Sequence, residues 1–215
     1  MRKIVIIGAG GHARVVASVV KAMMLSGEKV KIAGFIDKNT NYKNSFAEVI
    51  GTDQDIKSLM QKRLITDFII GIGAIKAGCV SRRRLFKHVS ELGLNPFSAI
   101  APSAQVADNV IVGAGTVVVH GAIINTGTQI AENSVINTGA IIDHDCRIGS
   151  NTLISPGCIL SGNVSVGNNA LLGTGSCVRQ SILIGDNCTV GAGSVVVSDV
   201  ETNTMVYGNP ACLAK

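Results

Sequence analysis

The fold is decided by a stretch in which an aliphatic residue returns at every sixth position, as in INTGAIIDHDCRIGSNTLISPGCIL at residues 136–160. The period runs unbroken from residue 100 to residue 196, and a mostly small or β-branched side chain follows four residues after each aliphatic. Such a repeat is typical of a parallel β-helix, in which three hexads form one triangular coil. The aliphatic positions are Ile100, Val106, Val112, Val118, Ile124, Ile130, Ile136, Ile142, Ile148, Ile154, Leu160, Val166, Leu172, Val178, Ile184, Val190 and Val196.

A coil of three hexads predicts which residues lie above one another. Each inward aliphatic should stack on the residue 18 positions away, and so should each small inward residue. Cys146, Cys158 and Cys188 fall on the small position, so we interpret them as core residues and not as metal ligands or nucleophiles. The six cysteines have no regular spacing in a chain large enough to build a core, which indicates reduced thiols.

Composition divides the chain near residues 94–100. Residues 1–99 hold 16 Lys and Arg against 7 Asp and Glu, together with all five Phe, whereas residues 100–215 hold 3 against 7. We therefore predict two domains, 1–95 and 96–215, with a hinge at Asn95-Pro96. The basic first domain has no nucleic-acid-binding motif, so a small anionic ligand is favoured over nucleic acid. No apolar run reaches the roughly 20 residues of a membrane span, which favours a soluble, cytoplasmic protein.

The first domain has the pattern of a small α/β nucleotide-binding unit. Strands are expected at residues 3–8, 30–37, 48–51 and 67–71, and helices at 12–25, 53–61 and 80–92. The first strand leads into the helix through Gly8-Ala9-Gly10-Gly11-His12-Ala13, where glycines let the backbone approach a phosphate at the helix N-terminus. Taken alone, this turn also fits a tight loop without a ligand, and Asp37 lies later than the acid of a dinucleotide fold.

Together these motifs resemble the sugar O- and N-acetyltransferases of the sialic-acid O-acetyltransferase type. The resemblance rests on the turn at Gly8–Val15, on Phe35-Ile36-Asp37, on the hexads with His144-Asp145, and on the closing Tyr207–Ala211. The pattern is most similar to bacterial nucleotide-diphospho-4-amino-sugar N-acetyltransferases. The resemblance implies a left-handed β-helix, a homotrimer, acetyl-coenzyme A in the groove between neighbouring prisms, and a nucleotide-sugar held by a Rossmann-like first domain.

Acetyl transfer needs a base for the proton of the attacking group and a donor for the thioester oxyanion. Of the four histidines, His144 stands at an outward turn position of its hexad, and Asp145 follows it and could orient the imidazole. One coil further along, the chain has Gly162, whose backbone N–H should lie over the imidazole. The resemblance implies the same roles, with His144 as the base, Asp145 as its acid and Gly162 as the amide donor.

The resemblance implies two further groups of contacts. Acetyl-coenzyme A is expected to lie against Asn137, Thr174, Ala192 and Pro210. The nucleotide-sugar is expected to lie against Gly8, Gly10, Gly11, His12, Asp37 and Gly71.

One position departs from the family pattern. Related N-acetyltransferases often carry a second histidine nine residues after the catalytic one, where this chain has Leu153. No metal is expected, because His120 lies on a different coil and face from His144 and the close histidine pair of a trimer-interface zinc site is missing.

The predicted reaction is transfer of acetyl from acetyl-coenzyme A to the amino group of a nucleotide-diphospho-amino-deoxy sugar, such as a 4-amino-4,6-dideoxy sugar, for surface-glycan biosynthesis. O-acetylation of a sialic-acid-like sugar is the alternative within this class. A non-catalytic trimeric scaffold that binds nucleotides is the alternative from another class.

Overall fold

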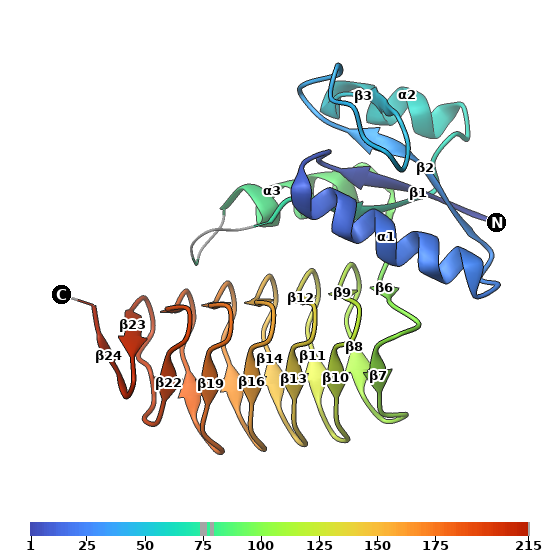
Figure 1. Cartoon of the computed structure of the whole chain (residues 1–215). Helices are drawn as coiled ribbons and strands as arrows, with labels where there is room; N and C mark the ends of the chain where they lie inside the picture. The colour runs from blue at the N-terminus through green and yellow to red at the C-terminus, as the bar shows by residue number, and fades with distance from the viewer. Residues whose placement is uncertain (74–76, 78–79, 215) are drawn as a thin grey trace. The chain divides into compact units, whose positions relative to one another are not determined.

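The computed structural model describes residues 1–73, 77 and 80–214 (Figure 1). Contacts between Cα atoms divide the chain into two units. The first consists of Met1–Gly73 and Val80–Pro102, and the second is built mainly from the hexad region that begins at Ser103. Among the described residues, no helix has both the length and the apolar character that a bilayer crossing demands.

The first unit is a five-stranded parallel sheet with helices packed against it (Figure 1). The chain builds the sheet outward from β1, then returns to the other side of β1 to add β4 and β5, giving the order β3-β2-β1-β4-β5. Ligands in such α/β folds bind at the carboxyl edge of the strands, where the order reverses. The elements are β1 (Arg2–Ile7), α1 (Gly11–Leu25), β2 (Val30–Ile36), β3 (Val49–Gly51), a 3₁₀ turn (Asp53–Asp55), α2 (Ile56–Gln61), β4 (Asp67–Ile70), α3 (Val80–Glu91) and β5 (Asn95–Pro96).

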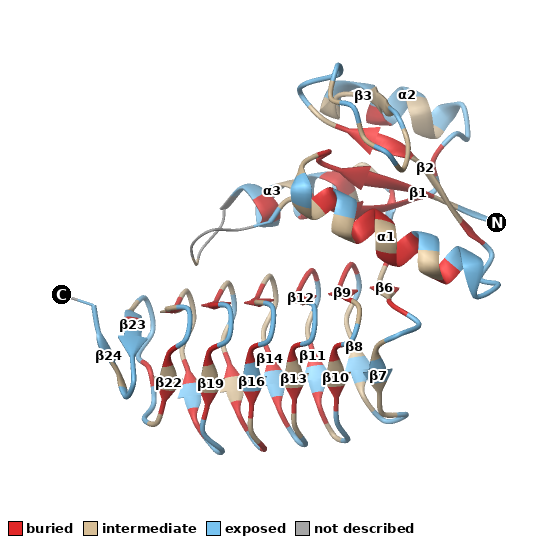
Figure 2. Cartoon of the chain, viewed as in Figure 1, coloured by how far each residue is buried: buried red, intermediate tan, exposed pale blue. Residues whose placement is uncertain are grey.

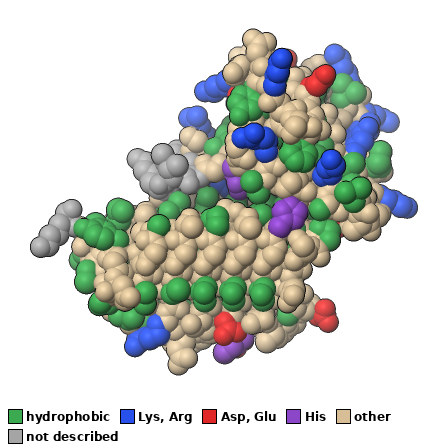
Figure 3. Space-filling view, in the orientation of Figure 1, with side chains coloured by type: hydrophobic (Ala, Val, Ile, Leu, Met, Phe, Trp, Pro, Cys, Tyr) green, Lys and Arg blue, Asp and Glu red, His purple; other side chains and the backbone are tan. Residues whose placement is uncertain are grey.

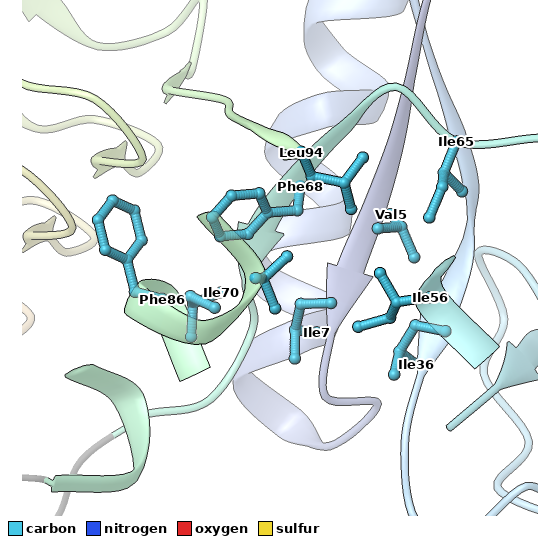
Figure 4. Close-up of a cluster of buried hydrophobic side chains, with 10 residues drawn as sticks. Val5, Ile7, Ile36, Ile56, Ile65, Phe68, Ile70, Phe86 and Leu94 are labelled. Atoms are coloured by element: carbon cyan, nitrogen blue, oxygen red, sulfur yellow. The ribbon is translucent and has the colours of Figure 1, made fainter. Parts of the chain in front are cut away.

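Alternate residues of these strands face opposite helical layers. Val5 and Ile7 of β1 belong to a buried cluster that includes side chains of α2 and α3 (Figure 4). On the other face, α1 packs close to the sheet because Gly71 has no side chain. A Cβ at Gly71 would be 2.6 Å from the side chain of Ile6 and 2.8 Å from that of Ala13.

The predicted hinge at Asn95-Pro96 is wrong, because these residues form β5 and pair in parallel with Asp67 and Phe68 of β4. The residue before a proline favours an extended backbone, which fits a strand as well as a hinge. Proline is tolerated in β5 because this strand lies at the sheet edge. The other strands and helices expected in this unit are confirmed to within one residue, with 53–61 divided into a 3₁₀ turn and α2.

The second unit is a parallel β-helix with stacked triangular coils (Figure 1). Two-residue strands recur every six residues from β7 (Gln105–Val106) to β22 (Val195–Val196), and residues 18 apart pair across neighbouring coils, as Ile141 pairs with Ile159. The strands between are β8 (Ile111–Val112), β9 (Val117–Val118), β10 (Ile123–Ile124), β11 (Gln129–Ile130), β12 (Val135–Ile136), β13 (Ile141–Ile142), β14 (Arg147–Ile148), β15 (Leu153–Ile154), β16 (Ile159–Leu160), β17 (Ser165–Val166), β18 (Leu171–Leu172), β19 (Cys177–Val178), β20 (Leu183–Ile184) and β21 (Thr189–Val190).

Both ends of the repeat have additional strands. The first expected aliphatic, Ile100, lies in β6 (Ala99–Ile100), which precedes the second unit. After β22 the chain forms an antiparallel hairpin of β23 (Met205–Gly208) and β24 (Ala211–Leu213), and β23 pairs in parallel with β21.

The core of the prism follows the hexads. The second residue of each strand is the aliphatic of its hexad, and these aliphatics are buried from Val118 to Val196 (Figure 2). The expected core position of Cys146, Cys158 and Cys188 is confirmed, since all three are buried free thiols. Cys177 and Cys212 are also free thiols, and Cys79 lies outside the described residues.

Candidate active site

The corner of the prism that follows β13 carries the histidine and its acid. Nδ1 of His144 lies 2.9 Å from Oδ2 of Asp145, and the His144 side chain is 54% exposed. Asp145 has a φ of 58°, a left-handed turn conformation that aspartate tolerates better than most residues. Donation from Nδ1–H to Asp145 selects the tautomer in which Nε2 carries the lone pair. The structure therefore brings together the two side chains that the sequence analysis selects.

Gly162 lies on the next coil, directly against the His144 ring. A Cβ at Gly162 would be 2.5 Å from Nε2 and 2.6 Å from Cε1 of the imidazole. Only glycine therefore leaves room for the ring in this position. No backbone hydrogen bond between described residues uses the Gly162 N–H as donor. The corner thus combines an imidazole with a residue one coil away whose peptide N–H has no backbone acceptor, and the 18-residue period predicts this proximity.

Neighbouring coils hold the backbone of this corner. Oδ1 of Asp143 accepts hydrogen bonds from Nδ2 of Asn125 at 2.9 Å and from the His144 N–H at 2.8 Å. The Thr128 hydroxyl donates to the Asp143 carbonyl at 2.9 Å, and the Asn163 N–H donates to the His144 carbonyl at 2.9 Å. The coils on both sides therefore fix the point from which the imidazole projects.

Two carboxylates tune the imidazole. The hydrogen bond that His144 donates to Asp145 is the main cause that raises the pKa of His144 above its ordinary 6.5, and the negative charge of Asp143 adds to it. The pKa of Asp143 is lowered, first by the Asn125 side-chain hydrogen bond and then by the His144 backbone N–H. His144 is therefore a stronger base than an isolated histidine, although a smaller fraction of it is neutral at a given pH.

The residues expected to contact acetyl-coenzyme A lie at another corner. Asn137, Thr174 and Ala192 each follow a strand of the sheet that contains β12, β18 and β21, and Pro210 lies in the turn between β23 and β24. Asn137 and His144 flank β13 on its two sides. Within one chain, the structure therefore separates this group from His144 by the width of one prism face.

That face carries a row of outward-facing apolar side chains. It is the β7–β22 sheet, of order β22-β19-β16-β13-β10-β7. From β10 to β22, the outward residue of each strand pairs with its equivalent 18 positions away, in the row Ile123, Ile141, Ile159, Cys177 and Val195. Ile159 is 40% exposed and the others are half-buried. Figure 3 shows such a row of hydrophobic side chains along the prism. Exposed apolar rows of this kind mark contact surfaces.

In the first unit, the glycine turn lies where a ligand is expected. Gly8 has a φ of 101°, and a Cβ there would be 2.9 Å from Ile72, so this position requires glycine. A Cβ at Gly10 or Gly11 would meet nothing within 4 Å, which leaves the backbone open. Gly10 caps α1 without a side-chain hydrogen bond, and the first turn of α1 has no acidic residue. These first-turn N–H groups can therefore bind an anion such as a phosphate.

Asp37 braces this turn from the end of β2. Its Oδ2 accepts the Ala9 N–H at 2.8 Å, and its Oδ1 accepts the Asn39 N–H at 3.0 Å. Asp37 also lines a cavity of about 170 Å³ next to Gly8, together with Lys38 and Asp53, which were not among the sequence candidates. The sequence contains a signal for Asp53, because this residue follows the strand β3. The carboxyl ends of β2 and β3 lie at one edge of the parallel sheet, so Asp53 is expected near Asp37.

His12, the second residue of α1, is held in its neutral form. Burial, followed by the positive charge of Arg82, lowers the pKa of His12 to about 4. Arg82 is buried, and its Nη1 donates to the carbonyls of Ile70 and Ile72 at 3.0 Å each. Nε2 of His12 is buried and has no hydrogen-bond partner among the described residues. Gly71 is another residue that the sequence analysis expects to contact the nucleotide-sugar. It is buried against α1, and in the structure it allows this helix to pack closely on the sheet.

The other histidine on the prism has a different neighbourhood. Nδ1 of His120 lies 3.2 Å from the Ser103 hydroxyl, at a corner that follows β9. Leu153, where relatives often carry a second histidine, is buried in β15. In the described part of the chain, no group of three or more His, Cys, Asp and Glu could hold a metal ion.

The structure combines stacked hexads, a histidine–carboxylate pair at one corner of the prism, and an α/β unit with an open glycine turn. This combination defines a two-domain hexapeptide-repeat transferase. Family models support this class. The PglD N-terminal domain matches residues 3–89, the hexapeptide repeat of succinyl-transferase matches 163–198, and the bacterial transferase hexapeptide (six repeats) matches 127–162 and 145–180. Comparison with curated protein sequences gives no significant match.

Solved structures narrow the class. PerB from Caulobacter crescentus, in complex with CoA and GDP-perosamine, is 34% identical, with a TM-score of 0.89 over 100% of this chain and 98% of that chain. The acetyltransferase domain of PglB from Neisseria gonorrhoeae is 34% identical, with a TM-score of 0.90 over 100% of both chains. The chain belongs to the family of left-handed β-helix, hexapeptide-repeat sugar N-acetyltransferases that carry a PglD-type N-terminal domain. This confirms the resemblance and the fold class predicted from the sequence.

Proposed function

We propose that this protein transfers the acetyl group of acetyl-coenzyme A to the amino group of a nucleotide-linked amino-deoxy sugar. The observation that carries the proposal is the corner at which His144, paired with Asp145 at 2.9 Å, packs against Gly162. The ligands of two similar proteins support it. PerB was solved with CoA and GDP-perosamine, and the PglB acetyltransferase domain with acetyl coenzyme A.

In the proposed reaction, the neutral amine attacks the thioester carbonyl carbon directly, without an acetyl-enzyme. Nε2 of His144 takes a proton from the amine as the new C–N bond forms. The Gly162 N–H donates a hydrogen bond to the carbonyl oxygen while that oxygen gains negative charge. Breakage of the C–S bond then releases the thiolate of coenzyme A, which takes the proton from the imidazolium. Asp145 stabilises the imidazolium in the interval through its hydrogen bond to Nδ1.

The two units hold different substrates in this proposal. The nucleotide-sugar lies at the open turn of Gly8, Gly10, Gly11 and His12, next to Asp37 and Gly71. The phosphates bind the first-turn N–H groups of α1. Acetyl-coenzyme A lies along the corner of Asn137, Thr174, Ala192 and Pro210.

The separation of the acetyl-coenzyme A corner from His144 supports a homotrimer. Within one chain, a prism face keeps His144 away from the acetyl-coenzyme A corner. When two chains pack side by side, His144 of one copy can lie next to the acetyl-coenzyme A corner of the other. The apolar row on the β7–β22 sheet supplies a surface for such contact. Light scattering at micromolar concentration should therefore give a trimer mass. A mass near one 22.2 kDa subunit would contradict the assembly.

An acetyl-transfer assay across a panel of nucleotide-linked amino sugars tests the reaction itself. Pairs of acceptors should differ only in whether an amine or a hydroxyl occupies the accepting carbon, with uridine, guanosine and thymidine nucleotides represented. We expect release of coenzyme A together with an amide product. Products found only on hydroxyl acceptors would establish O-acetylation. Nucleotide binding without turnover of any acceptor would establish a scaffold.

A further inference from the structure

The edge of the first unit opposite the glycine turn includes three segments that hydrogen bonds tie together. We call it the basal edge, and it consists of Met1–Lys3, Met24–Lys31 and Lys62–Asp67. The Arg2 N–H donates to the Lys29 carbonyl at 2.9 Å, and Nζ of Lys3 donates to the Arg63 carbonyl at 2.6 Å. Figure 1 shows the N-terminus and the end of α1 at this edge.

Positive charge is concentrated at the basal edge. Its segments hold six Lys and Arg against two acidic residues. One of these acids, Asp67, is buried and accepts the Arg2 guanidinium at 2.6 Å, which leaves Glu28 as the acid that faces solvent. Lys29, Lys62 and Arg63 are exposed. An anionic surface would therefore meet an edge that is basic along all three segments.

Apolar side chains protrude at the same edge. Within the described part of the first unit, the exposed large hydrophobic residues are Met1, Met24, Leu25 and Leu64, and all four belong to the basal edge. Leu25 is 80% exposed and Leu64 is 48% exposed. Isolated exposed leucines are common on proteins, but here they occur together and stand among cations.

We propose that the basal edge docks on the surface of an anionic lipid membrane. Lys and Arg are attracted to anionic headgroups, and leucines next to them can enter the boundary between headgroups and acyl chains. A folded acidic protein would satisfy the charges, but an anionic membrane offers both the charges and a continuous apolar layer that the protruding side chains can enter. The glycine turn lies at the opposite, carboxyl edge of the strands and stays accessible in this orientation. The inference does not depend on the proposed reaction.

Arg63 permits a variant that separates docking from stability. It lies two residues after the end of α2 and has a φ of 52°, while the Leu64 N–H donates to the Leu59 carbonyl at 3.0 Å, an arrangement in which glycine is the preferred residue. Arg63→Gly therefore removes a cation and relieves the backbone at the same time. We therefore expect weaker docking by this variant to reflect the lost cation and not unfolding.

The experiment is co-sedimentation of the full chain with vesicles of phosphatidylcholine alone or mixed with phosphatidylserine. We expect binding to the mixed vesicles only, weakened by salt. The triple variant Lys29→Ala, Lys62→Ala and Arg63→Gly should bind about a hundredfold more weakly, since each cation contributes roughly fivefold at an anionic surface. Leu25→Ser with Leu64→Ser should remove the binding that persists at high salt.

The matched control removes the same charge elsewhere in the first unit. Arg83→Ala, Arg84→Ala and Lys87→Ala exchange three exposed cations of α3 and should keep most of the vesicle binding. Equal losses in the two triple variants would overturn the proposal, because net charge and not the basal edge would then cause the binding. Failure of the native chain to sediment with the mixed vesicles would also overturn it, whatever acidic protein the edge then binds.

Discussion

His144 packs against Gly162 of the next coil so closely that a single methyl group on the glycine would be 2.5 Å from Nε2 of the imidazole. This relationship sets a proton acceptor beside a backbone donor. Both residues lie on coils joined by a ladder of backbone hydrogen bonds. The fold itself therefore sets the distance between them, and no loop has to close to bring them together. In a transferase, such preorganisation lowers the barrier where charge develops on the thioester oxygen.

Gly162→Ala should lower kcat while leaving the fold intact. The added Cβ meets the end of an exposed side chain, so the His144 ring can swing aside at little cost to stability. The base then leaves its position next to the donor, and we expect a loss of about 10²-fold in kcat. Steady-state kinetics and a thermal melt measure the two effects separately.

Gly149→Ala is the matched control for that variant. It makes the same substitution on the same prism, but its Cβ would be 2.6 Å from the backbone carbon of Gly167, which cannot move aside. We expect a lower melting temperature with nearly unchanged kcat per folded molecule. If Gly162→Ala lowered the melting temperature as much as Gly149→Ala and spared kcat, the assigned geometry would be wrong.

His144→Ala should lower kcat by about 10²–10⁴-fold with little change in either KM. The base acts in the transition state and adds little ground-state affinity. The loss should lie near the low end of this range, because a neutral amine is already a competent nucleophile toward a thioester. Activity within threefold of the native enzyme at saturating substrates would refute the assignment of His144 as the base.

Asp145→Asn should shift the pH profile and cost less activity than His144→Ala. The Asp145 hydrogen bond is the main cause that raises the pKa of His144, and a general base works only when neutral. The native kcat/KM should therefore rise with pH through an apparent pKa above 6.5, and the variant should rise at lower pH. An unmoved rising limb in Asp145→Asn would indicate that the ionisation of the acceptor amine sets the profile.

The repeat allowed much of the site to be predicted from the sequence. An unbroken hexad fixes which residue lies 18 positions away, so the contact between His144 and Gly162 follows from counting. The pairing of His144 with Asp145 was less constrained, because it depends on a left-handed turn at Asp145. The role of Asp143, which ties Asn125 to the His144 backbone, was harder to predict: Asn125 lies 18 positions before Asp143, but the period alone does not determine which polar side chains bond across the coils.

The first unit was harder to predict in detail. Strand pairing there is non-local, and β5 could not be distinguished from a linker because two residues carry no periodicity. Asp37 was expected to face the ligand, but the structure shows both of its oxygens already accepting backbone N–H groups. Such local bonds depend on the path of the turn, which composition and spacing do not determine.

Asp37→Ala should raise the KM for the nucleotide-sugar and leave that for acetyl-coenzyme A nearly unchanged. The variant loses the acceptor for the Ala9 N–H, so the glycine turn relaxes as well as losing a carboxylate. Hydrogen bonds to a charged group contribute enough for about a ten- to hundredfold change. Initial rates with each substrate varied in turn check this. Equal increases in both KM values would point to general damage of the fold.

The neutral state of His12 predicts acid sensitivity of the first unit. Its pKa is about 4 in the folded protein and near 6.5 when unfolded, so the unfolded chain binds more protons between these values. Neutral His12 therefore leaves the free energy of unfolding at its full value above about pH 6.5. As the pH falls toward 4, the free energy of unfolding decreases by roughly 3 kcal/mol. Urea unfolding, followed by the helical circular dichroism signal that comes from α1, α2 and α3, should show this loss. His12→Gln should flatten the stability profile in this window, whereas His88→Gln, which exchanges an exposed imidazole on α3, should preserve it. A native slope retained in His12→Gln would place the acid sensitivity elsewhere.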